Sequence, residues 1–174
     1  MSLCRQNFTD ASLNAINEQI NFEMRASYTY QSMAAYFSRD VVALKGFAAY
    51  FRKQSEEERE HALKLSDYIC NRGGRVVLHP IPAPESDWKS AKNALEQVLQ
   101  LERDVNEALL KLHKLADEQA DPHLADFLEA EYLQEQVHSL KEVAELLTNL
   151  NRVGGDGLGL FIFDRELLGS VSGK

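Results

Sequence analysis

The chain has 174 residues, of which 44% are hydrophobic, a composition that supports a sizeable buried core and excludes a disordered chain. Its net charge of -8 and its isoelectric point of about 5.1 argue against nucleic acid as a partner. No run of about 18 apolar residues is present, so we expect no membrane-spanning segment.

Apolar residues recur at three- and four-residue spacing through most of the chain, which predicts an all-α protein. Breakers separate the periodic stretches: Gly73-Gly74 ends one of them, prolines follow, and Asp121-Pro122 opens another. In chain order, the predicted helices span residues 10–38, 44–72, 87–119, 123–151 and, after a glycine-rich turn, 158–168.

The lengths of the connections predict the topology. The links after the first and third helices are short, so each of them joins two antiparallel helices. The link over residues 73–87 can extend about 50 Å. That exceeds the length of the second helix, about 42 Å, so the second and third helices can run parallel. We predict one domain over residues 1–174, a four-helix bundle with one long crossover and a short C-terminal fifth helix.

The most informative residues are Glu58 and His61, which lie three positions apart and share one helix face. At 100° per residue, Glu58 lies within about 20° of Phe51 and Leu65, and His61 lies within about 60° of Glu58. Both therefore face the apolar stripe. By the same arithmetic, Glu23 on the first helix, Glu102 on the third helix and Gln136 on the fourth helix also face inward.

Burying these polar groups is costly unless something compensates for it. Carboxylates with an imidazole can hold a metal ion, and this donor set suits iron or manganese. A single inward Glu is more often tilted or salt-bridged, but such residues on four helices together indicate a metal site. Tyr30 lies in phase with Glu23 and is either a redox or hydrogen-bonding neighbour or an ordinary core tyrosine.

The fourth helix carries a second Glu-x-x-His spacing, at Glu135 and His138. Both fall about 140–160° from Leu140, on the polar face, and we exclude them as ligands. One inward Glu-x-x-His remains, whereas a symmetric di-iron bundle has two. This argues against a di-metal oxygenase that acts on an organic substrate, although that alternative stays open.

Several segments together resemble ferritin of the heavy-chain, ferroxidase-bearing type, over almost the whole length of the chain. The segments are Arg5-Gln6-Asn7-Phe8, Ala26-Ser27-Tyr28-Thr29-Tyr30, Glu57-Glu58-Arg59-Glu60-His61-Ala62, Arg72-Gly73-Gly74-Arg75, Leu112-His113-Lys114-Leu115-Ala116, Asp121-Pro122-His123-Leu124 and Tyr132-Leu133-Gln134-Glu135-Gln136-Val137. The resemblance implies a shell of 24 subunits that oxidises Fe(II) with O2 and stores it as ferric mineral. It implies two irons per subunit, Glu58 bridging them and Tyr30 adjacent. The implied ligands are Glu23, Glu58, His61, Glu102 and Gln136.

The resemblance also implies a three-fold channel through which cations enter the shell. Asp126, Glu129, His113 and His123 would line it or lie near it. The family often has a cysteine where Ala125 stands.

An acidic group, Glu56, Glu57 and Glu60, would line the cavity of the shell and could nucleate mineral, although such a charge run is usually a solvated face. Leu63 stands where a further acid is common in the family. The resemblance places the fifth helix around a four-fold axis, and there Glu166 stands where a histidine is common.

The expected function is therefore ferroxidase activity with iron storage, with iron and O2 as partners. A structural shell subunit without catalysis, relying on other ferritin subunits for oxidation, stays open as an alternative. Cys4 and Cys70 form no motif and suggest no disulfide framework. The N-terminus shows no leader pattern, so we expect a cytoplasmic protein, although a processed organelle form would look the same.

Overall fold

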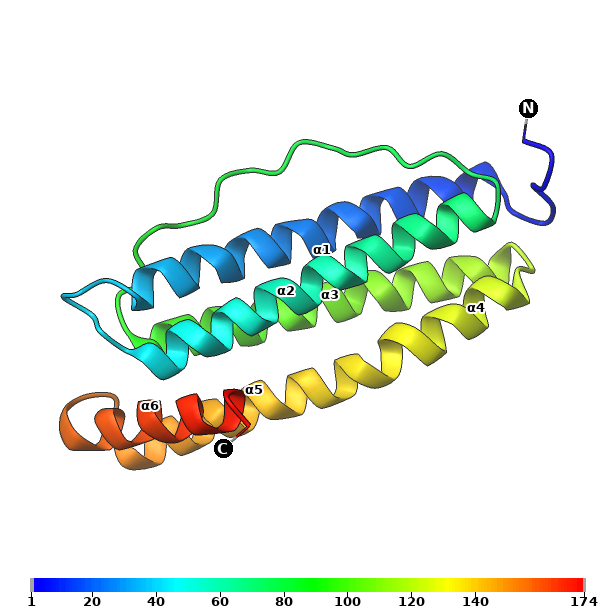
Figure 1. The fold of residues 1–174 in the computed structure, drawn as a ribbon. Helices are drawn as coiled ribbons and strands as arrows, with labels where there is room; N and C mark the ends of the chain where they lie inside the picture. Colours follow the sequence, from blue (N-terminus) through cyan, green and yellow to red (C-terminus); the bar gives the residue numbers. More distant parts are fainter. Residues whose placement is uncertain (1, 174) are drawn as a thin grey trace.

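The computed structural model describes residues 2–173, which form helices and connecting turns without a strand (Figure 1). The helices are α1 (Asp10–Phe37), α2 (Lys45–Asn71), α3 (Ala91–Glu118), α4 (Pro122–Leu128), the π-helix η1 (Glu129–Leu133), α5 (Gln134–Val153) and α6 (Gly157–Val171). α4, η1 and α5 follow one another without a break and form the fourth long helix of the bundle. The predicted all-α bundle with a short fifth helix is confirmed.

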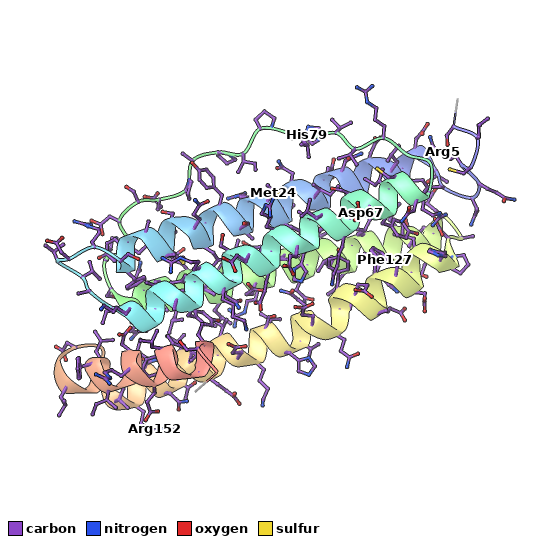
Figure 2. All side chains as sticks on the ribbon, in the orientation of Figure 1. Arg5, Met24, Asp67, His79, Phe127 and Arg152 are labelled. Carbon is purple, nitrogen blue, oxygen red and sulfur yellow. The ribbon has the colours of Figure 1, made fainter. Side chains whose placement is uncertain are left out.

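The long connection between α2 and α3 crosses the length of the bundle alongside α1 (Figure 1). Asn17 Oδ1 accepts the Val77 N–H at 2.8 Å, and Asn21 Nδ2 donates to the His79 carbonyl at 3.2 Å. Figure 2 labels His79 on the connection and Met24 on α1, and both line one small pocket. Because the connection returns the chain to the starting end of α2, α2 and α3 run in the same direction, as the loop lengths predict.

The start of α3 differs from the prediction by four residues. The helix begins at Ala91 rather than at residue 87 because Lys89 has a φ of 60°, outside the helical region. Ser90 then caps the helix, since its Oγ accepts the Asn93 N–H at 3.1 Å. The residues before Ala91 are therefore irregular rather than helical.

An aromatic cluster fills the core between α1 and α2. The ring of Phe37 lies 5.3 Å from that of Phe47 and 5.5 Å from that of Phe51, and Tyr30 stacks on Phe51 at 6.1 Å. All four side chains are buried. Across the described residues, every helix is too short or too polar to cross a bilayer.

α6 packs against the N-terminal end of α2, which has no side-chain cap of its own. The buried Asp164 of α6 supplies the missing acceptor, because its Oδ1 accepts the Phe47 N–H at 3.0 Å. Gly46 allows this approach, since a Cβ at its position would lie 1.9 Å from the Asp164 carbonyl oxygen. The outward side of α6 nevertheless leaves apolar side chains exposed, namely Leu158, Phe161 and Ile162.

Candidate metal centre

Four helices contribute to one polar cluster in the interior of the bundle. Its members are Glu23 from α1, Glu58 and His61 from α2, Glu102 from α3 and Gln136 from α5. The three carboxylates and the amide are buried, and the imidazole is partly buried. Helical phase therefore located these side chains correctly, and their role as metal ligands stays a prediction.

Glu23, Glu58 and His61 form one half of the cluster. Each offers a ligand atom, and these atoms all lie within 4.8 Å of one another. His61 Nδ1 lies 3.3 Å from Glu58 Oε2. Gln19 Nε2 donates to Glu23 Oε1 at 2.8 Å, whereas the buried Glu23 Oε2 has no hydrogen-bond partner. This half of the cluster thus presents a carboxyl oxygen without a hydrogen-bond partner beside two further potential metal ligands.

Glu102 organises the other half. Gln136 Nε2 donates to Glu102 Oε2 at 2.7 Å and to the Glu102 carbonyl at 2.9 Å. The buried Tyr30 hydroxyl donates to Glu102 Oε1. Tyr30 is therefore a hydrogen-bonding neighbour of the cluster, one of the two interpretations that the sequence left open.

The carboxylates of the cluster repel one another and are poorly solvated. Burial raises the pKa of Glu23 well above its usual range, and the Glu58 carboxylate raises it further. Burial also raises the pKa of Glu58 to about 8 and raises the pKa of Glu102. Within residues 2–173, no Lys or Arg forms an ion pair with any of the three. A cation that entered the cluster would displace protons and supply the missing positive charge.

The fourth helix corrects one expectation. A rotation of 100° per residue over 123–151 predicts an inward Val137 and an outward Glu135, but η1 interrupts the regular α-helix. Val137 is 67% exposed. Glu135 is exposed, as expected, and its Oε2 lies 3.2 Å from His61 Nε2, a contact that helical phase did not predict. His138 is exposed, as expected.

Two further residues at the cluster were missed by the sequence argument. Gln19 lies one turn before Glu23, and its i, i+4 spacing could have identified it. Tyr132 lies within η1, is buried, and donates its hydroxyl proton to the His61 carbonyl at 2.8 Å. A regular helix pattern gives no signal for Tyr132, because its direction depends on the π-turn.

The structure brings together part of the predicted channel group. His113 Nε2 lies 2.6 Å from Glu129 Oε1, and both side chains reach solvent. His123 Nδ1 instead lies 3.2 Å from the Tyr68 hydroxyl, while Asp126 is exposed on α4. A three-fold channel needs neighbouring subunits, so it stays a prediction for this chain.

The predicted nucleation group lies on α2, away from the core. Glu56 and Glu60 are exposed. Glu57 is partly buried, pairs with Lys53 at 3.1 Å and accepts from Gln54 at 2.6 Å. This is also the arrangement of an ordinary solvated helix face, so the geometry leaves both interpretations of the group open.

The stability of the metal-free protein should fall as pH rises, because Glu58 holds its proton more tightly when folded. Its pKa rises from the usual 4.5 to about 8. The stabilisation is fully present below the unfolded pKa and is lost as pH rises through the folded pKa, a change on the order of 5 kcal/mol. We expect Glu58→Gln to gain stability relative to the original protein between about pH 5 and about pH 8.5. Denaturant unfolding in chelator measures this difference, and a difference independent of pH would contradict it.

Comparison with known proteins places the cluster within a shared domain. Residues 13–153, which include all five cluster residues, match the family model described as a ferritin-like domain. The chain is 54% identical to soma ferritin of Lymnaea stagnalis over 173 residues, which cover 99% of each chain. It is 52% identical over 173 residues to the chloroplastic ferritin of Malus baccata var. xiaojinensis, covering 97% of this chain and 69% of that protein.

Proposed function

This chain belongs to the ferritin family, and we propose that it oxidises Fe(II) with O2 at the cluster of Glu23, Glu58, His61 and Glu102. The oxidised iron would be stored as ferric mineral inside a shell of 24 subunits, formed by this chain alone or with other ferritin subunits. Iron is the substrate and the cargo of this reaction. The protein would supply the ligands and exclude bulk water from the reacting ions.

The observation that carries this proposal is the unpaired Glu23 Oε2. It is the one buried side-chain N or O atom in residues 2–173 without a hydrogen-bond partner, and the carboxyl group to which it belongs lies beside Glu58 and His61. An orphaned buried carboxylate oxygen is costly to the fold. A metal ion would satisfy it, and carboxylates with one imidazole suit iron.

The residues of the cluster would bind two Fe(II) ions. By the family resemblance, Glu23, Glu58 and His61 hold one ion, while Glu58 and Glu102 hold the other with Gln136 near it. Each ion would give up one electron, and the two electrons would reduce O2 to the peroxide level. The hydroxyl of Tyr30, which donates a hydrogen bond to Glu102, would orient that carboxylate.

Assembly and compartment are parts of the same proposal. The exposed apolar side chains of α6 are costly in an isolated chain, and contact with other subunits would bury them. From the sequence we propose a cytoplasmic location for this chain. One of its relatives, by contrast, is a chloroplast protein.

Stopped-flow absorbance on the assembled, metal-free protein tests the reaction. After anaerobic Fe(II) loading, mixing with O2 should give a fast transient that saturates near two irons per chain. The double substitution of Glu58→Ala and His61→Ala should abolish the transient, because it removes donors from both ion positions.

A matched double substitution controls for the loss of charge and imidazole. His138 and Glu145 are exposed on α5, outside the cluster, so His138→Ala with Glu145→Ala should leave the transient unchanged. Slow, monotonic oxidation that the cluster substitutions do not affect would contradict the proposal. It would favour a shell subunit without catalysis.

A further inference from the structure

The imidazole of His61 has a carboxyl group near each of its ring nitrogens. Nδ1 lies 3.3 Å from Glu58 Oε2, on the side of the cluster, and Nε2 lies 3.2 Å from Glu135 Oε2. Glu58 is buried, but the side chain of Glu135 is 46% exposed. The two carboxylates therefore approach the ring from the interior and from the surface, respectively.

A histidine binds a metal through one nitrogen in its neutral form, and the other nitrogen then carries the proton. Which nitrogen is free depends on the hydrogen bond that the other one makes. Glu135 Oε2 lies close enough to Nε2 to accept a proton from it, and with the proton on Nε2 the lone pair of Nδ1 would lie on the side of Glu58.

We propose that Glu135 is a positioning residue, which fixes the ring orientation and the tautomer of His61 so that Nδ1 faces the metal centre. The inference rests on the proposed function, since it concerns how the same site binds metal. Glu135 would act through His61 and would not itself be a ligand of the bound ions.

The local structure of the fourth helix explains how Glu135 reaches the ring. Glu135 and Gln136 are adjacent and point to different partners, His61 on α2 and Glu102 on α3. α5 therefore contacts both α2 and α3 through these two adjacent side chains. In the preceding π-helix, Tyr132 donates its hydroxyl proton to the backbone carbonyl of His61 and packs against the edge of its ring. One short segment thus contacts both the backbone and the ring of the histidine.

A competing role for Glu135 is attraction of cations by its charge alone, and the choice of substitution separates the two roles. Glu135→Gln removes the charge but keeps a side-chain oxygen that can accept from Nε2–H. Glu135→Ala removes both. Glu131 offers a matched control, because it lies one turn earlier, is similarly exposed and pairs with Lys64 at 3.2 Å.

Anaerobic Fe(II) titration by calorimetry on the assembled protein, without O2, gives a readout other than activity. Glu135→Ala should weaken the tightest class of sites about 10- to 100-fold, whereas Glu135→Gln should stay within about threefold of the original protein. Glu131→Ala should leave the affinity unchanged. With Co(II) alone as probe, Glu135→Ala should alter the visible spectrum of the bound ion, and Glu135→Gln should preserve it.

Two results would overturn the inference. Equal weakening by Glu135→Gln and Glu135→Ala would show that charge matters rather than orientation, and unchanged affinity in Glu135→Ala would show that His61 needs no such support. His61→Ala separates these results from a failure of the proposed function. If His61→Ala also leaves the tightest sites intact, the cluster is not the metal site at all.

Discussion

Replacing Glu23 by Gln should make the metal-free protein more stable and should remove its tight metal binding. The side chain of Glu23 is fully buried, and burial together with Glu58 raises its pKa well above the usual range. Gln has the same shape and no charge, and its oxygen can still accept from Gln19. Its amide hydrogens would face the Glu58 carboxyl in place of a repelling oxygen.

We expect Glu23→Gln to raise the free energy of unfolding of the metal-free protein by about 1–4 kcal/mol near neutral pH. Metal affinity at the centre should fall by at least about 100-fold, more than the loss of an outer hydrogen bond costs. Denaturant unfolding in chelator measures the first quantity, and anaerobic Fe(II) titration measures the second.

Glu18→Gln provides the control, because Glu18 is exposed on the same helix. It should change stability by less than about 0.5 kcal/mol and should leave metal binding unchanged. A less stable metal-free Glu23→Gln protein would mean that the carboxylate is already compensated without metal. In a metal-binding site, this substitution raises the stability of the metal-free protein and lowers its metal affinity. In a structural ion cluster, stability and metal affinity would both fall.

Most of the fold could be predicted because long amphipathic helices have a regular spacing of apolar residues in the sequence. A constant rotation per residue correctly predicted that Glu23, Glu58 and Glu102 face the core, because α1, α2 and α3 are regular over their whole lengths. The length of the proline-containing connection was enough to predict the crossover. These inferences need only local geometry.

The fourth helix shows where local geometry stops being sufficient. The π-helix η1 interrupts the regular α-helical rotation and shifts the directions of some later side chains, although Gln136 still faces inward. Val137 consequently points outward, while Glu135 reaches His61. The contact between Tyr132 and the His61 carbonyl joins residues 71 positions apart, so a helix pattern in the sequence cannot show it. The cap that Asp164 supplies to α2 is another such long-range contact.

Asp121→Ala should cause the largest loss of stability away from the metal centre. Asp121 is 2% exposed, and its carboxylate accepts from both terminal nitrogens of Arg72, at 3.1 and 2.8 Å. It also caps α4, because Oδ1 accepts the Leu124 N–H at 3.1 Å. Removing one partner of a buried pair costs about 3–5 kcal/mol, and losing the cap adds about 1 kcal/mol. Denaturant unfolding at fixed subunit concentration should show this loss.

An exposed pair supplies the control for Asp121. Asp10 pairs with Arg5 at 2.6 Å, but its side chain is 84% exposed, so Asp10→Ala should cost at most about 1 kcal/mol. Similar losses for the two substitutions would contradict the argument, because burial is what separates them.

A double-substitution cycle then tests whether the cost arises from the pair itself. Arg72 also donates to the Asn7 carbonyl at 2.7 Å and lies 4.8 Å above the ring of Phe8, so it ties the N-terminal segment to the ends of α2 and α3. Arg72→Met keeps apolar packing on that ring but leaves Asp121 unpaired. If the unpaired charge is the main cost, the double variant should lose less stability than the sum of the two single losses, by about 1–3 kcal/mol. Additive losses would instead assign the stabilisation to the separate contacts of each residue.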